Sequence, residues 1–259
     1  MREELQPSIL DHIVIQDKNV SEVTEVTLGA HCAKVSCRPA LRPELGIVLH
    51  LIKGNKMITL YGSPRSSAGR CFWALEEAGV PYTQKDVDMR NKEHKSPEFL
   101  KINPMGKVPA MIDGDITLFE SMAINYYIAD TYKKELLGTN ALEKGLSIQW
   151  SFWAISELQP PIIEAFIQKV FVPEDKRDNS VIEKNLNKLP ALLTVLNNTL
   201  ADKKYLAGNQ FTIGDINTAS VVSICPMMGV DLGEYSNIKT WLGTISERPA
   251  FQKYQALCK

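Results

Sequence analysis

The feature that most constrains the fold is a dense alternation of strand and helix patterns between residues 57 and 132. Four short segments have the apolar runs or the alternation typical of strands: 57–61, 82–87, 108–112 and 116–118. Three segments have helical spacing or helix-start signals: 66–78, a short helix from Ser96, and 120–132. The order β-α-β-α-β-β-α ends in a hairpin at Asp113-Gly114-Asp115 and not in another crossover, which predicts an α/β domain with a mixed sheet.

The chain after this domain is helical in pattern. A polar stretch over residues 133–141 predicts a linker, and every periodic segment from residue 142 onward has helical spacing. We expect helices over the following ranges: 142–170, 180–200, 213–223, 238–247 and a short one after Pro249. Pro160-Pro161 is expected to kink or break the first of them. The sequence thus predicts an α/β domain over residues 57–132 and an all-helical domain over residues 142–259.

The first 56 residues differ from the rest. They contain weak strand-like stretches at 13–15 and 23–28 but no sustained helical period. We therefore expect residues 1–56 to be an extension that is dispensable for fold and activity, although the apolar run 45–52 could pack on the body. His31, Cys32 and Cys37 lack the spacing of metal ligands, so we predict no metal site there.

Composition excludes several classes of function. The 259 residues are 44% hydrophobic and 23% charged. The net charge is −1, so the chain as a whole has no positive electrostatic field that would attract nucleic acid or anionic lipid. No apolar run is long enough to span a membrane. The five cysteines are odd in number and form no CxxC pair, which favours a reducing compartment. We expect a cytoplasmic protein.

Four motifs, in this order and spacing, resemble the cytosolic glutathione transferase family: Ser66-x-x-x-Arg70, Asn103-Pro-Met-Gly-Lys-Val-Pro109, Glu120-Ser121 and Thr212-Ile-Gly-Asp215. The resemblance spans residues 57–259 and is closest to the serine-using theta, delta and phi classes. It implies a thioredoxin-like glutathione-binding domain followed by an all-helical C-terminal domain. It also implies a homodimeric enzyme that conjugates glutathione to a small, apolar electrophile, without a further cofactor.

The proline motif and the Glu-Ser pair are the expected glutathione-binding segments. The resemblance implies a cis bond before Pro109, which turns the backbone of Val108 toward the cysteinyl backbone of glutathione; an ordinary loop is the alternative. Glu120-Ser121 lies where a strand gives way to a helix, and a helix N-terminus favours a carboxylate. The γ-glutamyl carboxylate would bind at Ser121, with Glu120 facing the ammonium group. The alternative is that Ser121 is only an N-cap.

Ser66 is the expected catalytic residue. Conjugation needs a thiolate, and a free thiol has a pKa of about 8.5. A hydroxyl that donates to sulfur at a helix N-terminus favours the charged form, and lowering the pKa by about two units requires only about 2.7 kcal/mol. Ser66 would be a hydrogen-bond donor and not a nucleophile. Its spacing from Arg70 favours it over Ser67, which stays open as an alternative.

Further residues complete the expected site. His94-Lys95 resembles the phi-class segment that reaches the glycyl carboxylate of glutathione, with Lys107 assisting; a solvated charge cluster is the alternative. Cys71 lies on the apolar face of its helix, so we interpret it as a structural thiol. Thr212 to Asp215 is a capping box, which serves folding.

The electrophile and the activity class are less constrained. Apolar residues just past Pro160-Pro161 could line the electrophile cleft: Ile162, Ile163 and Phe166. Two other functions stay open at this point. One is a non-catalytic assembly module with a glutathione-transferase-like fold, and the other is a glutathione-dependent thiol transferase acting through Cys71.

Overall fold

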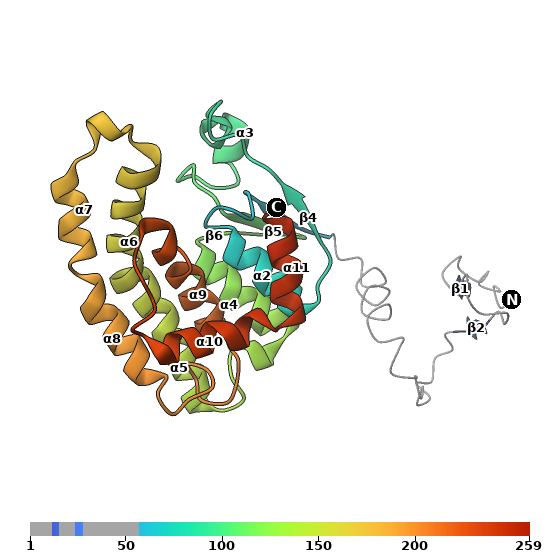
Figure 1. The fold of residues 1–259 in the computed structure, drawn as a ribbon. Helices are drawn as coiled ribbons and strands as arrows, with labels where there is room; N and C mark the ends of the chain where they lie inside the picture. Colours follow the sequence, from blue (N-terminus) through green and yellow to red (C-terminus); the bar gives the residue numbers. More distant parts are fainter. Residues whose placement is uncertain (1–11, 16–23, 28–56) are drawn as a thin grey trace, which may run out of the picture. The chain divides into compact units, whose positions relative to one another are not determined.

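The computed structural model describes residues 12–15, 24–27 and 57–259 (Figure 1). Strands β1 (His12–Ile15) and β2 (Thr24–Thr27) pair antiparallel in a two-stranded sheet of their own. These strands agree with the strand-like stretches noted in the sequence. His31, Cys32, Cys37 and the apolar run 45–52 lie outside the described residues.

A four-stranded sheet forms the centre of the part between residues 57 and 132. Its strands are β3 (Ile58–Tyr61), β4 (Tyr82–Lys85), β5 (Ala110–Asp113) and β6 (Ile116–Phe119), in the order β4-β3-β5-β6. β3 and β4 are parallel because α2 (Gly69–Ala78) crosses over between them. β5 is antiparallel to β3 and to β6, so the sheet is mixed, as the sequence predicted.

Two further helices belong to this part, α3 (Pro97–Leu100) and α4 (Ser121–Tyr132), and α4 packs against α2. Ser96 caps α3 as expected, because its hydroxyl accepts a hydrogen bond from Phe99 N at 3.1 Å. α2 begins three residues later than the expected Ser66, since residues 63–66 close a turn in which Ser66 N donates to Ser63 O at 2.9 Å.

The rest of the chain is helical. Its α-helices are α5 (Ala141–Trp153), α6 (Gln159–Phe166), α7 (Asn179–Leu186), α8 (Leu189–Thr199), α9 (Ile213–Val222), α10 (Ser236–Ser246) and α11 (Pro249–Leu257). Two π-helical segments, η5 (Ala154–Leu158) and η6 (Ile167–Phe171), flank α6. None of these or the other described helices has the length and apolarity needed to cross a membrane.

Three further features differ from the sequence expectation. Pro160 and Pro161 do not break the long helix, because they occupy the first turn of α6 directly after the wider π-helical turn of η5. The expected helix 180–200 is two helices, and Pro190 stands in the first turn of the second. The expected linker contains a short 3-10 helix, η4 (Lys134–Leu136), and its Leu136 and Leu137 are buried.

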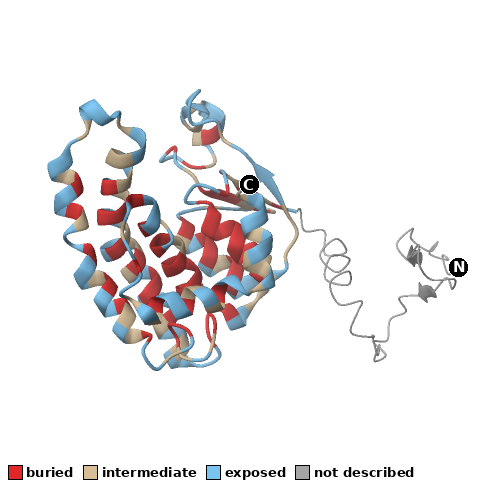
Figure 2. Cartoon of the chain, viewed as in Figure 1, coloured by how far each residue is buried: buried red, intermediate tan, exposed pale blue. Residues whose placement is uncertain are grey.

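The two parts share one continuous core, and Figure 2 shows the buried residues gathered in the central helices. Every residue of α9 except Ser220 is buried. A polar chain crosses this core: Asn125 Nδ2 donates to Asn217 Oδ1 at 2.7 Å, and Asn217 Nδ2 donates to Ser151 Oγ at 2.8 Å. These bonds fix α4, α9 and α5 relative to one another, because each buried polar group would be costly without its partner.

The capping box at the start of α9 is confirmed. Asp215 Oδ2 accepts from Thr212 N at 2.9 Å, and Oδ1 accepts from Leu206 N at 2.9 Å and from Trp241 Nε1 at 3.0 Å. Burial raises the pKa of the Asp215 carboxyl to about 6, although these donors act in the opposite direction. Asp215 therefore joins three segments at the centre of the helical part.

Candidate functional site

Strand pairing brings three loops to one edge of the sheet. Tyr61, the last residue of β3, pairs with Ala110, and Ala110 pairs with Phe119, the last residue of β6. The residues immediately beyond these positions, Pro109 and Glu120 among them, therefore lie at the same edge. The sheet thus gathers the segments that hold the expected serine, the proline motif and the Glu-Ser pair.

The serine segment is a tight turn that joins β3 to α2. Within it Ser66 N and Ser66 Oγ both donate to Ser63 O, at 2.9 and 2.7 Å, and Ser63 Oγ accepts from Arg65 N at 3.2 Å. Pro64 stands at the second turn position, where its fixed φ is favourable. The side chain of Ser66 is exposed, so its hydroxyl is accessible from the edge of the sheet.

Ser66 and Val108 both lie close to Gly62. A Cβ atom built on Gly62 would lie 3.5 Å from Ser66 Oγ and 3.1 Å from Val108 Cβ. Gly62 has φ of +126°, which only glycine adopts readily. The bond between Val108 and Pro109 is cis, as the resemblance implied. Asn103 Nδ2 holds the loop by donating to Lys107 O at 2.6 Å.

Glu120 and Ser121 lie at the start of α4. Glu120 precedes the helix with φ of +71°, an unusual conformation for a residue with a side chain, and its carboxylate is exposed. Ser121 is the first helical residue and is buried, with its carbonyl accepting from Cys71 Sγ at 3.6 Å. Ser121 is not the N-cap, so that alternative is wrong. A strained residue at a loop edge is a common mark of a functional site.

His94 and Lys95 form a 3-10 turn, η3 (Glu93–Lys95), against the proline loop. A Cβ built on Gly106 would lie 2.7 Å from His94 O and 2.7 Å from Lys95 Nζ, and Lys95 Nζ donates to Met105 O at 3.1 Å. The ammonium of Lys95 thus already has a backbone partner within this loop. Lys107 is exposed beside it, so the expected glycyl-binding residues lie together.

Comparison with known proteins identifies the family. The family model of the glutathione S-transferase N-terminal domain matches residues 56–130, and the model of the C-terminal domain matches residues 158–249. Glutathione S-transferase 1 of Zea mays is 38% identical over 208 residues, which cover 77% of this chain and 96% of that protein. The chain belongs to the glutathione S-transferase family.

Solved glutathione transferases share the fold. Glutathione S-transferase I from mais, in complex with an atrazine glutathione conjugate, has a TM-score of 0.71 and is 36% identical. The match covers 78% of this chain and 98% of that protein's chain. A theta-class glutathione S-transferase from Xanthomonas axonopodis pv. citri, with glutathione bound, has a TM-score of 0.71 at 32% identity and covers 76% and 95%. The fold expected from the motifs, a thioredoxin-like domain followed by a helical domain, is confirmed.

Cys71 has the position of a structural thiol in this glutathione transferase. It is fully buried in α2, and burial raises the pKa of its thiol to about 12. Its Sγ donates a weak hydrogen bond to the carbonyl oxygen of Ser121 at 3.6 Å. A thiol held neutral and away from solvent is a poor nucleophile, which argues against thiol transfer through Cys71.

Sequence reasoning missed the environment of Arg70. Its guanidinium is 5% exposed and donates from Nη2 to Gln159 Oε1 at 2.7 Å, which joins α2 to α6. Nε and Nη1 have no hydrogen-bond partner among the described residues, and burial lowers the pKa of the group. In the sequence, Arg70 served only to locate Ser66 four positions before it. A helical pattern does not show which distant helix covers a side chain, so the contact with α6 could not be predicted.

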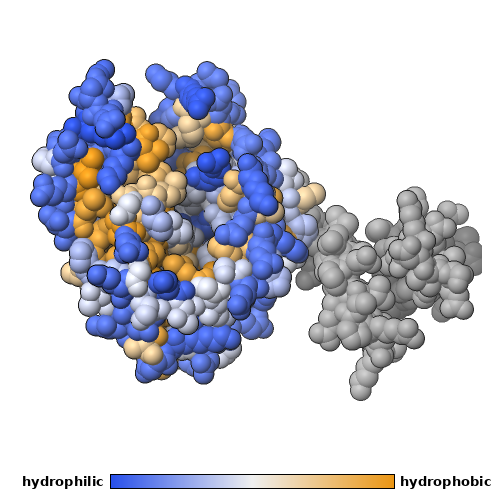
Figure 3. Space-filling view, viewed as in Figure 1, coloured by the Kyte–Doolittle hydropathy of each residue, from blue (hydrophilic) through white to orange (hydrophobic). Residues whose placement is uncertain are grey.

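The helical part contributes an apolar surface. Figure 3 shows apolar side chains gathered over α6, where the surface is hollowed between this helix and the sheet-containing part. Ile163 and Phe166 are half-buried there, and Ile167, Val170 and Phe171 are exposed. Ile162 is fully buried in the core, so its expected place in the cleft lining is wrong. Successive residues in an α-helix point about 100° apart, so Ile162 faces the core while Ile163 lies nearer the surface.

Proposed function

We propose that this glutathione transferase joins the glutathione thiolate to a small apolar electrophile, with Ser66 as the hydrogen-bond donor to sulfur. The observation that supports it most is that Ser66 Oγ and Val108 both lie close to Gly62 at the edge of the sheet. A peptide that pairs with the backbone of Val108 would place its cysteinyl side chain beside this hydroxyl.

Glutathione would bind along the edge of the sheet through three groups. The cysteinyl backbone pairs with Val108 ahead of the cis Pro109, and the γ-glutamyl carboxylate takes the N-terminal end of α4 at Ser121. Glu120 is exposed and placed to meet the ammonium group. The glycyl carboxylate is directed toward the three cationic or ionisable side chains beside the proline loop: His94, Lys95 and Lys107.

The chemistry needs no proton carrier beyond the solvent and no further cofactor. The bond that forms joins the glutathione sulfur to the electrophilic carbon, the sulfur supplies the electron pair, and a leaving group or the electrophile's own π-system receives the displaced pair. Ser66 stabilises the thiolate as it donates its hydrogen bond, and the N-terminal end of α2 adds a favourable dipole. The hydroxyl has to turn from Ser63 O to the sulfur to do so.

The exposed apolar surfaces suggest where the electrophile binds and how two chains could associate. We propose that the electrophile binds in the hollow over α6, beside Phe166 and Phe171, whose rings lie 5.7 Å apart. We also propose a homodimer, because Met105 is 53% exposed at the tip of the proline loop and Phe152 is 65% exposed on α5. The described cysteines are free thiols, which suits the proposed cytoplasmic location.

Titration calorimetry with glutathione and a turnover assay with an activated aryl chloride test this function. We expect glutathione to bind and the aryl conjugate to form. Binding without turnover on a panel of electrophiles would favour the assembly-module alternative. Absence of binding at millimolar glutathione would contradict both glutathione-dependent functions.

A further inference from the structure

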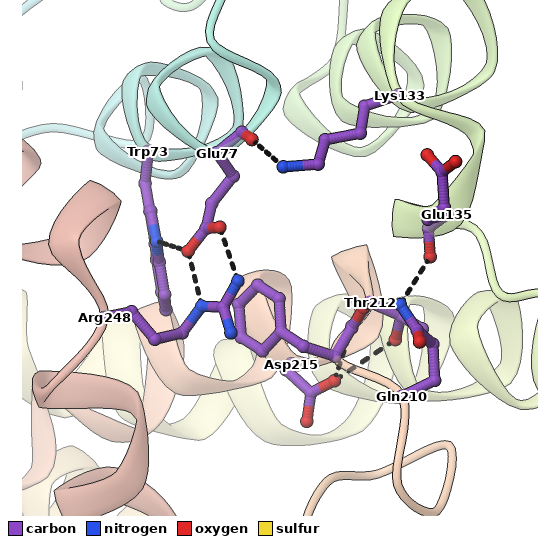
Figure 4. A network of polar contacts seen from close by, with 9 residues as sticks. Trp73, Glu77, Lys133, Glu135, Gln210, Thr212, Asp215 and Arg248 are labelled. Carbon is purple, nitrogen blue, oxygen red and sulfur yellow. Dashed lines mark hydrogen bonds and ion pairs between the residues drawn. The ribbon is translucent and has the colours of Figure 1, made fainter. Parts of the chain in front are cut away.

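The last helix of the chain packs on α2 directly behind the serine turn. Phe251 and Tyr254 of α11 contact the indole of Trp73, with ring centroids 4.7 and 6.1 Å away, and the Tyr254 ring is nearly parallel to it at 7°. At the start of α11, Arg248 binds the carboxylate of Glu77 through two hydrogen bonds (Figure 4). α11 is therefore held against α2 at its start and along its middle.

From this position α11 contacts the serine turn itself. Tyr254 donates its phenolic hydrogen to Pro64 O at 3.3 Å, and Cys258 Sγ lies 3.8 Å from the same oxygen. The approach is close: a Cβ built on Gly69 would lie 2.3 Å from Pro64 O and 2.6 Å from Tyr254 Oη. Only a glycine at this place lets the turn, α2 and α11 meet.

The contact restrains the peptide group between Pro64 and Arg65, which lies one residue ahead of Ser66. Pro64 O and Arg65 N belong to one planar peptide group. Its oxygen is held by Tyr254, and its N–H is held by Ser63 Oγ at 3.2 Å. With both ends held, the plane cannot rotate freely, which restricts the turn that carries Ser66.

We propose that Tyr254 is a positioning residue for Ser66: through Pro64 it holds the serine turn in the geometry from which the hydroxyl reaches the glutathione sulfur. This inference rests on the proposed function of Ser66. Tyr254 does not touch substrate in this role. Removing its hydroxyl leaves the ring packing on Trp73 intact but lets the turn relax, so the hydrogen bond to the thiolate weakens.

The test is the pH profile of kcat/KM for Tyr254→Phe. We expect its thiol limb to move upward by about half a pH unit, with kcat/KM below that limb falling about threefold and glutathione affinity by calorimetry unchanged. Gly69→Ala disturbs the same contact from the other side and should produce a shift in the same direction. It serves as the second variant if Tyr254→Phe does not fold.

Two controls separate positioning from packing. Tyr82→Phe removes a phenolic hydrogen bond at the far end of α2, where Tyr82 Oη donates to Glu76 Oε1 at 2.8 Å, and should leave the profile unchanged. Phe251→Leu weakens the packing on Trp73 without touching Pro64, and should lower the melting temperature without moving the thiol limb.

A double variant makes the dependence on Ser66 explicit. If Tyr254 acts through Ser66, Tyr254→Phe causes no further shift of the thiol limb in the Ser66→Ala background. An unshifted Tyr254→Phe profile, together with a shifted Ser66→Ala profile, would overturn the inference and leave the proposed function intact. An unshifted Ser66→Ala profile would overturn the role of Ser66 and, with it, this inference.

Discussion

Arg248 and Glu77 form a bidentate ion pair: Arg248 Nε donates to Glu77 Oε1 at 2.7 Å, and Arg248 Nη2 donates to Glu77 Oε2 at 2.6 Å. Glu77 also accepts from Trp73 Nε1 at 3.1 Å, and the Arg248 guanidinium lies 3.7 Å from the centroid of the Phe211 ring. The pair thus joins α2 in the sheet-containing part to the start of α11 in the helical part (Figure 4).

We expect Glu77→Gln to lower the free energy of unfolding by about 2 kcal/mol, because it leaves a half-buried guanidinium without its counter-charge. Urea unfolding followed by circular dichroism measures this. Replacing both partners, as in Glu77→Gln with Arg248→Met, should recover part of the loss. Asp130→Asn on the exposed side of α4 is the matched control and should change stability little. A Glu77→Gln chain as stable as the control would show that the pair contributes nothing.

Ser66→Ala should lower turnover of an activated aryl chloride by about tenfold or more while leaving glutathione affinity nearly unchanged, because in the proposed role the hydroxyl acts on the thiolate. The thiol limb of the pH profile of kcat/KM should move upward. Ser67→Ala is the matched control one position along the chain. A shift in Ser67→Ala and none in Ser66→Ala would reassign the donor to Ser67.

Substitutions at the start of α4 should weaken glutathione binding itself. In the proposed role, Glu120 and Ser121 contact the end of the peptide remote from sulfur. We therefore expect about tenfold weaker binding for Glu120→Ala and for Ser121→Ala, seen as a higher KM with little change in kcat. Titration calorimetry measures the affinity, and Asp115→Asn in the neighbouring hairpin serves as control. Wild-type affinity in a folded double alanine variant would place the γ-glutamyl group elsewhere.

Asp215 should make stability depend on pH in an unusual direction. Its carboxyl has a pKa raised from 3.8 to about 6 by burial, so the folded chain holds the proton more tightly than the unfolded chain. The stabilisation this gives is complete below about pH 4 and is lost as the pH rises through about 6, by about 3 kcal/mol. The measurement is the unfolding free energy of the wild type minus that of Asp215→Asn across this range. A difference that rises with pH would contradict the raised pKa.

A chain beginning at Met57 tests the extension. We expect it to melt cooperatively within a few degrees of the full chain and to keep its glutathione activity, since the first strand of the mixed sheet, β3, starts at Ile58. The full chain under the same conditions is the control. Aggregation, or a loss of more than about 2 kcal/mol of stability, would show that the first 56 residues support the fold.

The fold was predictable where local chemistry decides it. Gly79 ends α2 with φ of +68°, and Ser96 caps α3, so both boundaries follow from the residue type alone. The start of α2 was not predictable, because a serine can begin a helix or close the turn before it. Here Ser66 closes the turn through hydrogen bonds to Ser63 O, and its Oγ accepts from Ala68 N. A local pattern does not distinguish these outcomes.

In the candidate site, too, only some features could be predicted from the residue types. The cis bond before Pro109 and the positive φ of Gly62 are conformations that these residue types permit far more readily than others, so a motif can reveal them. Glu120 adopts positive φ against its own preference, and nothing in its type signals this. The contact of Tyr254 with Pro64 joins residues 190 positions apart, and no periodicity along the chain reports such a pairing.

The hydrogen bond from Ser66 Oγ to Ser63 O also bears on what the serine can recognise. A neutral thiol is a weak acceptor, and a backbone carbonyl competes with it successfully, whereas a charged sulfur attracts the hydroxyl about twice as strongly as a neutral acceptor does. In the proposed role, the serine would therefore change partners only once glutathione had lost its proton. The turn would then act as a detector of ionisation, ignoring the resting peptide and responding to its reactive form.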